Sequence, residues 1–181
     1  MTPDRVAAAL GSSVKVTTPY DELVADVALD AWRPAALTAR DDLGLTFFDL
    51  LTAVDVRADG FEVVVRVWSV ADRTGLQLRT RCAAQHAVIA SLHDVYAGAR
   101  WHERQVAELF GITFTGHPGL DPLLLAPDAG HPLRKDSVLA ARVATPWPGA
   151  KEPGESDRDL TGRSRRKNLP LGVTVRDLEQ R

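Results

Sequence analysis

Three consecutive runs of strand-like sequence constrain the fold of this chain more than any other feature. They are Leu45–Val56, Phe61–Trp68 and Leu76–Cys82, and apolar and polar side chains alternate along most of their length. Turn-forming residues at 58–60 and 72–75 separate the runs. A period of two places apolar side chains on one face of a sheet and polar side chains on the other. The sequence therefore predicts an antiparallel meander with one face in water.

Helices are expected on both sides of this meander. Helical spacing and helix-end signals predict helices at Pro3–Leu10, Trp32–Leu43, Gln85–Leu92 and Tyr96–Phe110. Val14–Thr17 is expected to be a strand, and Leu23–Leu29 fits a strand better than the start of a helix. Together these elements predict an α+β fold for residues 1–112, a two-layer domain in which helices pack on a mixed or antiparallel sheet.

The chain changes character at residue 113. Helical and strand periodicity do not continue beyond this point, and prolines recur. The first part is too apolar for a solvated linker, because it contains five leucines between positions 120 and 133. Residues 113–150 are expected to form an extended, irregular docking arm that packs on the preceding domain or on another chain. Residues 151–181 are expected to form a charged, mobile tail.

The composition excludes several classes of protein. A net charge of -2 gives no basis for nucleic-acid binding or for an electrostatic membrane anchor. No apolar run approaches the ~20 residues of a transmembrane helix, and the N-terminus lacks the pattern of a signal peptide. A single cysteine, Cys82, cannot build a disulfide framework or an iron–sulfur site by itself. Cys82 is expected on the same face of its strand as Leu76 and Leu78, and therefore to be buried in the sheet.

The segment Trp101–Asp136 is the densest in candidate site residues. It contains His102, His117 and His131, but none of them pair at the spacing of about two to five residues that zinc ligands usually show. We therefore expect no metal, and we expect the histidines of the loop to fix it by hydrogen bonds. His102 and Glu103 are adjacent on a helix and point about 100° apart, which disfavours an acid–base pair. The sequence also lacks the glycine-rich phosphate-binding and nucleophile motifs.

Docking onto a partner is the interpretation that this segment favours. Glu103 and Arg104 are each expected to find a separate partner across an interface. Arg134, Lys135 and Asp136 follow a proline and a leucine, so we expect extended backbone that presents their charges alternately. The aromatic side chains that could anchor such a contact are Trp101, Phe110, Phe114 and Trp147.

The same segment resembles the signature of a known family. The blocks that carry the resemblance are Glu103-Arg104, Leu109-Phe110-Gly111-Ile112, Gly116-His117-Pro118 and Gly130-His131-Pro132-Leu133-Arg134-Lys135-Asp136. In this order they resemble the C subunit of the proton-pumping NADH–quinone oxidoreductase, the 30-kDa subunit family of respiratory complex I. The run Thr52-Ala53-Val54-Asp55 echoes another motif of that family.

The resemblance implies a non-catalytic subunit in the peripheral arm of that enzyme, on the cytoplasmic side of the bacterial cell membrane. It implies an arm that wraps the D subunit and lies near iron–sulfur subunits. Flavin and iron–sulfur clusters would belong to partner subunits, and NADH and quinone would be reached only through the assembled, proton-translocating complex. No catalytic, cofactor or metal ligands are expected in this chain. The residues implied at the subunit interface are Glu103, Arg104, Phe110, Gly111, Gly116, His117, Pro118, Gly130, His131, Pro132, Leu133, Arg134, Lys135 and Asp136.

Three places depart from the family pattern. Gln105 stands where a glutamate is usual, Glu108 where an aspartate is usual, and Asp-Pro-Leu-Leu at 121–124 replaces Arg-Arg-Ile-Leu. The last exchange removes two positive charges and adds a negative one, which should alter a charged contact. Two other functions stay open, the first of them because of these departures. One is the equivalent subunit of a complex I-like membrane-bound hydrogenase or alternative-donor quinone reductase, and the other is a stand-alone metal-dependent enzyme that uses His102, His117 and His131.

Overall fold

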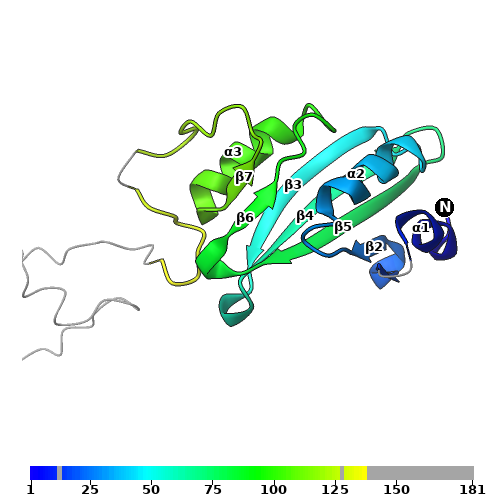
Figure 1. The fold of residues 1–181 in the computed structure, drawn as a ribbon, viewed down its shortest axis with the longest axis horizontal. Coiled ribbons are helices and arrows are strands. Elements are labelled where there is room, and N and C mark those ends of the chain that lie inside the picture. The colour runs from blue at the N-terminus through cyan, green and yellow to red at the C-terminus, as the bar shows by residue number, and fades with distance from the viewer. Residues whose placement is uncertain (12–13, 127–128, 138–181) are drawn as a thin grey trace, which may run out of the picture. The chain divides into compact units, whose positions relative to one another are not determined.

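A five-stranded mixed sheet forms the centre of the computed structural model, which describes residues 1–11, 14–126 and 129–137 (Figure 1). The strand order is β1-β2-β5-β4-β3, with β3, β4 and β5 antiparallel and β2 parallel to β5. The predicted tail at 151–181 and the last part of the predicted arm lie outside the described residues. The strands are β1 (Lys15–Thr17), β2 (Leu23–Asp26), β3 (Phe47–Asp55), β4 (Phe61–Ser69) and β5 (Thr74–Cys82).

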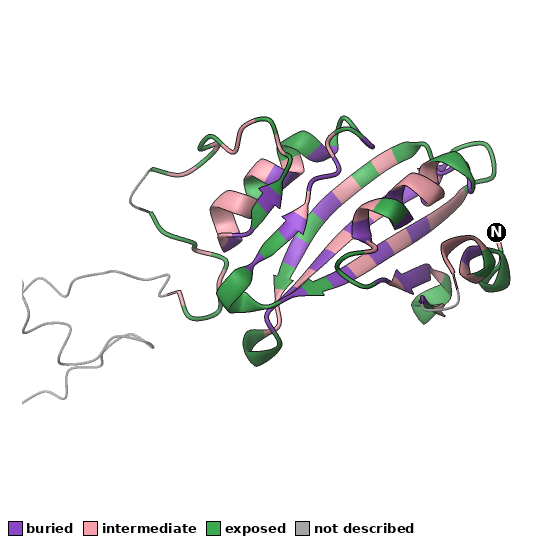
Figure 2. Cartoon of the chain, viewed as in Figure 1, coloured by how far each residue is buried: buried purple, intermediate pink, exposed green. Residues whose placement is uncertain are grey.

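The predicted meander is confirmed. Every second residue of β4, from Phe61 to Ser69, is buried, and the residues between them are partly exposed. Figure 2 shows the same alternation in β5 from Leu76 onward, whereas in β3 the buried residues are Leu51 and Ala53. The turn into β4 requires Gly60, because its φ is 88° and an added Cβ would lie 2.2 Å from the carbonyl oxygen of Cys82. Cys82 is buried as predicted, and burial raises the pKa of its thiol.

Three α-helices pack with this sheet. They are α1 (Pro3–Leu10), α2 (Trp32–Asp41) and α3 (Ala99–Phe110), and short 3-10 turns occupy Pro19–Asp21, Arg57–Asp59 and Ala84–His86. Figure 1 shows α2 lying over the long strands and α3 beside β3. The side chain of Trp32 and the alanines of α2 are buried in the same hydrophobic core as β4 and β5. The α+β class is therefore confirmed. No helix among the described residues has the length and apolar character to cross a membrane.

The prediction of a helix at Gln85–Leu92 was wrong. The segment contains a 3-10 turn and the strand β6 (Val88–Ala90), which pairs in parallel with β7 (Thr113–Thr115). This pairing is long-range, so local spacing could not reveal it. The regular fold consequently extends three residues beyond the predicted boundary at 112. Residues 1–137 belong to one compact unit.

The long helix begins at Ala99, three residues later than predicted. Tyr96 lies in the preceding segment instead, where its buried hydroxyl donates to the carbonyl oxygen of Leu45 at 2.9 Å. The backbone N–H of Leu92 is also held from outside the segment, by the side chain of Glu103. These tertiary bonds hold residues 91–98 in a non-helical connection between β6 and α3.

Candidate functional site

Glu103 points from α3 into the protein. Its side chain has no solvent exposure, and its carboxylate accepts the backbone N–H of Leu92 at 2.6 Å and the hydroxyl of Ser91. Burial raises the pKa of Glu103 to about 7, although the bonds from Ser91 and Leu92 act in the opposite direction. Both hydrogen-bond partners of this predicted interface residue therefore lie in the same chain, inside the domain.

His102 contacts a different element from Glu103. Its Nδ1 lies 3.1 Å from the carbonyl oxygen and 3.4 Å from the amide nitrogen of Leu51, in the edge strand β3. The imidazole also packs edge-on against Phe48, with ring centroids 5.2 Å apart. An edge strand carries unpaired backbone groups, and His102 covers one position of that edge. Its contacts give it a structural role.

Arg104 and Glu108 hold one loop by its backbone. The guanidinium of Arg104 donates to the carbonyl oxygens of Asp121 and Pro122, both at 3.0 Å. The Glu108 carboxylate accepts three consecutive backbone N–H groups, those of residues 123, 124 and 125, at 2.8–3.1 Å. Arg104 and Glu108 are four residues apart and so share one side of α3. Two of the departures from the family pattern, Glu108 and residues 121–124, are thus in direct contact.

The charge of Glu108 suits this role. Partial desolvation acts to raise its pKa, but the bonds from the N–H groups of Leu125, Leu124 and Leu123 outweigh it, and the pKa lies below its usual value. Because only backbone atoms of the loop are bound, the side chains of residues 121–125 are free of this contact. Leu124 is 66% exposed.

His117 fixes the start of the same loop. Its Nδ1 accepts the backbone N–H of Gly119 at 3.0 Å, so its Nε2 is the protonated nitrogen and donates to the carbonyl oxygen of Arg100 at 3.1 Å. The expectation that this histidine fixes the loop through hydrogen bonds is confirmed. Among the described residues, no three His, Cys, Asp or Glu side chains lie together as a metal-binding group.

The second Gly-His-Pro block covers the C-terminal end of α3. Arg134 Nε donates to the carbonyl oxygen of Phe110 at 2.6 Å, and His131 Nδ1 lies 2.8 Å from the carbonyl oxygen of Glu108. The last carbonyls of a helix lack partners within the helix and form its negative end, so a cation is favourable there. Gly111 makes the close approach possible: its φ is 72°, and an added Cβ would lie 2.5 Å from the Arg134 guanidinium.

Asp55 is a further anchor, and the sequence signalled it only as part of a family motif. Its carboxylate accepts the backbone N–H of Lys135 at 2.8 Å and that of Arg57 at 2.7 Å. The bond from Lys135, followed by that from Arg57, lowers the pKa of Asp55. Its position at the end of a strand before a turn is a local signal, since aspartate often binds the backbone two residues later. Nothing in the sequence around Asp55 indicates its contact with Lys135.

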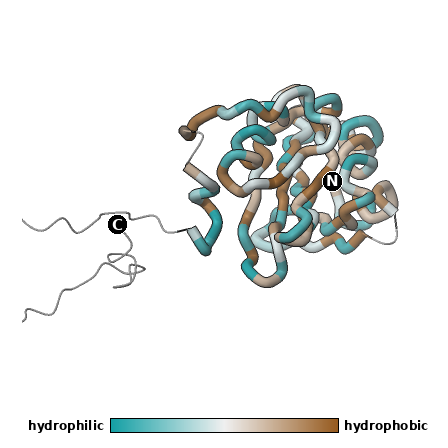
Figure 3. The backbone as a smooth tube through the Cα atoms, turned by 60° about the vertical axis from the view of Figure 1, so that its left-hand side comes forward, coloured by the Kyte–Doolittle hydropathy of each residue, from teal (hydrophilic) through white to brown (hydrophobic). Residues whose placement is uncertain are grey.

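These contacts leave several large apolar side chains of α3 and the arm facing solvent. Trp101 is 60% exposed and Leu133 is 50% exposed, in addition to Leu124. The guanidinium of Arg104 lies over the Trp101 ring at 5.2 Å, which places Trp101 next to the loop that Arg104 binds. Figure 3 shows a hydrophobic stretch of this loop just before the short grey segment at 127–128. We define Trp101, Leu124 and Leu133 as the arm surface.

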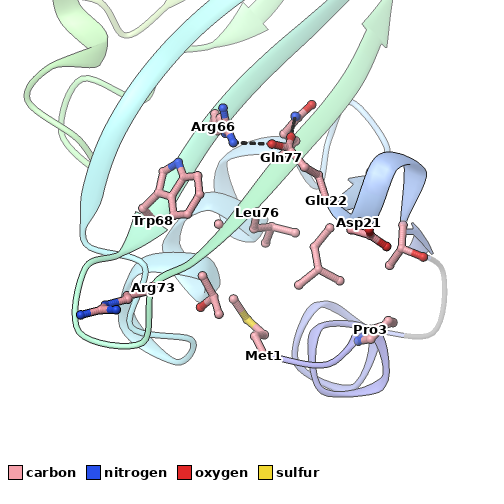
Figure 4. Close-up of a pocket in the computed structure, with 13 residues that line it drawn as sticks. Met1, Pro3, Asp21, Glu22, Arg66, Trp68, Arg73, Leu76 and Gln77 are labelled. Carbon is pink, nitrogen blue, oxygen red and sulfur yellow. Dashed lines mark hydrogen bonds and ion pairs between the residues drawn. The ribbon is translucent and has the colours of Figure 1, made fainter.

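One hollow of the described residues lies elsewhere. It measures about 370 Å³ and is lined by residues of the N-terminal segment, β4 and β5, with Arg66 paired to Glu22 at 2.5 Å across it (Figure 4). None of its lining residues belongs to α3 or to the arm. The contacts described for Glu103, Arg104, His117, His131 and Arg134 are thus intramolecular, and none of these residues lines this hollow.

Residues 25–143 match the family model described as the respiratory-chain NADH dehydrogenase, 30 Kd subunit. The chain belongs to this 30-kDa subunit family. The resemblance found in the sequence is thereby confirmed, and the matched range includes the end of β2, the strands β3 to β5, α3 and both Gly-His-Pro blocks.

Relatives within the 30-kDa subunit family align with part of the chain. This chain is 42% identical over 107 residues to the C subunit of the NADH-quinone oxidoreductase of Roseiflexus castenholzii. The alignment covers 56% of this chain and 62% of the relative. The chain is 32% identical over 158 residues to the corresponding C subunit of Bordetella petrii, covering 75% and 76% of the two chains. The chain thus spans less than two thirds of the length of the Roseiflexus relative.

Two solved structures share the fold. One is "Nqo5 of the trypsin-resistant fragment (1-134)", with a TM-score of 0.56, 20% identity, and coverage of 64% of this chain and 94% of that chain. The other belongs to the membrane-bound sulfane sulfur reductase, an archaeal respiratory membrane complex, with a TM-score of 0.66, 22% identity, and coverage of 85% and 94%. At these identities the likeness establishes the α+β architecture alone.

Proposed function

We propose that this chain is a non-catalytic peripheral-arm subunit of a NADH–quinone oxidoreductase, and that it binds neighbouring subunits through the arm surface. Membership of the 30-kDa subunit family carries this proposal. In the assembled enzyme, electrons would pass from NADH to quinone with proton translocation, through flavin and iron–sulfur clusters that other subunits hold. The partner that we assign to the arm is the D subunit, with iron–sulfur subunits nearby, on the cytoplasmic side of the bacterial membrane.

The internal contacts of the site support a structural role. The side chains of Glu103, His117 and Arg134 bind groups of the same chain, and so do those of Arg104 and Glu108. The side chains other than Glu103 fix the backbone of residues 117–125 and the block at 131–134 against α3. Apolar side chains that a fold holds rigidly in solvent are suited to a subunit interface, because little conformational entropy is lost when a partner covers them.

The experiment is affinity purification of the tagged chain from its native cells. We expect the wild-type chain to co-purify with respiratory subunits, and Leu124→Asp together with Leu133→Asp to reduce their recovery at unchanged chain stability. Val70→Asp is the matched control, because Val70 is also exposed but lies beyond the end of β4, on the turn into β5. Recovery unchanged in the leucine double variant would refute the arm surface as the docking site.

The electron donor of the purified complex decides between the main proposal and its alternative. Oxidation of NADH by the complex supports a NADH–quinone oxidoreductase, and the isolated chain should show none. A complex that lacks flavin- and NADH-binding subunits, or that contains a nickel-ligating large subunit, would assign the chain to a complex I-like hydrogenase or alternative-donor reductase. The sequence of residues 121–124 differs from the family pattern, and this segment contacts Glu108, which also differs. This contact is the reason to retain the alternative function.

A further inference from the structure

A chain of three hydrogen-bonding side chains leads from the surface to the buried Glu103. The Ser91 hydroxyl contacts the Glu103 carboxylate on one side and lies 3.0 Å from His93 Nδ1 on the other. Ser91 Oγ also accepts the backbone N–H of His93 at 3.2 Å. His93 is only partly buried, and its Nε2 has no hydrogen-bond partner among the residues that the structure describes. The chain therefore begins at a nitrogen that solvent can reach.

The Ser91 hydroxyl can form its hydrogen bonds to Glu103 and His93 in two arrangements. When Glu103 is ionised, Ser91 donates to the carboxylate, and His93 must donate its Nδ1 proton to Ser91. When Glu103 is protonated, its O–H donates to Ser91, and Ser91 donates to an unprotonated His93 Nδ1. The Ser91 hydroxyl donates one hydrogen bond and accepts from the His93 amide and one neighbouring side chain in both arrangements. The two states differ by one proton on Glu103 and by the tautomer of His93.

We propose that Glu103, Ser91 and His93 form a proton-transfer chain that makes the attachment of residues 91–95 to α3 depend on pH. A proton from solvent binds Nε2 of His93. The Nδ1 proton of His93 passes to Ser91 Oγ, and the hydroxyl proton of Ser91 passes to the Glu103 carboxylate. One proton enters and one is delivered, so no other reactant is needed.

His117 does not belong to this chain. Its ring lies edge-on to His93 with centroids 6.0 Å apart, but both of its nitrogens are engaged by the backbone. This leaves His93 as the entry point.

The charged surroundings favour the protonated state of Glu103. Asp94 is the negative group that disfavours the Glu103 charge, and Asp94 itself is paired with Arg33. The strands β6 and β7 contribute no titratable side chain. The other charged or titratable groups of the elements packed here are Arg40 and Asp41 of α2, Asp49 and Asp55 of β3, Tyr96 of the connection, His117 after β7, and Arg100, His102, Arg104 and Glu108 on α3 itself.

The sign of the effect follows from burial. Ionised Glu103 has two hydrogen bonds and no water, whereas in an opened segment it would be fully hydrated. Opening of residues 91–95 is therefore favoured as pH rises. With a pKa of about 7 in the closed state and the usual 4.5 in the open state, linkage predicts that the opening equilibrium increases about tenfold between pH 6 and pH 8.

The first test is direct titration of the wild-type chain by NMR. We expect the ¹³C signal of the Glu103 carboxyl carbon to titrate near neutral pH, and the ring nitrogens of His93 to show an inflection at the same midpoint. Ser91→Ala should remove that shared inflection from His93. His86→Gln, which removes an exposed histidine elsewhere, should leave it unchanged. Titration of Glu103 near its usual pKa, or no shared inflection, would overturn the proposal.

The second test measures how stably residues 91–95 are attached to α3. Hydrogen exchange of the Leu92 amide, corrected for the intrinsic pH dependence of exchange, should become about tenfold less protected from pH 6 to pH 8 in the wild type. Glu103→Gln retains one acceptor and one donor and so imitates the protonated state. Its protection should be constant over this range. Equal pH profiles for both proteins would contradict the proposal, and the wild-type titration decides the matter if the variant does not fold.

Discussion

Asp55 and Lys135 are 80 residues apart in the sequence and are joined by a 2.8 Å hydrogen bond from the Lys135 amide to the Asp55 carboxylate. The bond ties the second Gly-His-Pro block to the end of the edge strand β3. Asp55 also accepts the Arg57 amide, so both carboxylate oxygens are used. The arm is thus anchored to the sheet as well as to α3.

Replacement of Asp55 by asparagine should loosen this anchor. An amide side chain keeps one acceptor oxygen, so one of the two backbone N–H groups loses its partner. We expect faster hydrogen exchange at the Lys135 amide and faster proteolysis after residue 130, with the sheet unchanged. Asp59→Asn changes an exposed aspartate of the adjacent turn and is the control. Equal proteolysis of the two variants would show that Asp55 does not hold the arm.

Arg134 and Lys135 should behave differently although both are cationic. Arg134 binds the Phe110 carbonyl and lies over the Phe61 ring at 5.3 Å, whereas Lys135 is held through its backbone. Arg134→Ala should weaken the seating of residues 131–137 on α3 by about 1–2 kcal/mol, measured by native-state hydrogen exchange. Lys135→Ala should have little effect on it. If Arg134→Ala together with Lys135→Ala reduces the recovery of partner subunits, the loss should come mainly from Arg134.

Gly111 and Gly116 form a second matched pair. Both have a positive φ, 72° and 85°, but an added Cβ meets the Arg134 and His131 side chains only at Gly111. Gly116→Ala should cost only the strain of the left-handed backbone, about 1 kcal/mol. Gly111→Ala should cost more and also displace the arm. Thermal unfolding gives the first quantity, and proteolysis of the arm gives the second. An arm undisturbed in Gly111→Ala would contradict the described contact.

The local part of the fold could be predicted from the sequence, and the long-range part could not. The meander followed from alternation, because each strand pairs with its sequence neighbour across a short turn. The pairing of β6 with β7 joins two three-residue segments across α3, and such short runs carry no period. Glu103 was expected to find its partner across an interface, as one of two adjacent charged residues with separate partners. Its partners, Ser91 and Leu92, lie in a connection that was itself predicted to be helical.

The arm should detach in acid, by a mechanism opposite in sign to that of Glu103. The folded pKa values of Asp55 and Glu108 lie below their usual values, so each stabilises the arm above its unfolded pKa, and that stabilisation is lost as pH falls through the folded pKa. The usual values are 3.8 and 4.5, so the loss is expected below about pH 4. Glu103, with a pKa of about 7, is already protonated in this range, so its stabilising effect on the domain is fully present there. We therefore expect amides of residues 123–125 and 135 to lose protection at low pH while the Leu92 amide stays protected. Simultaneous loss at all of these amides would instead indicate that arm and domain unfold as one unit.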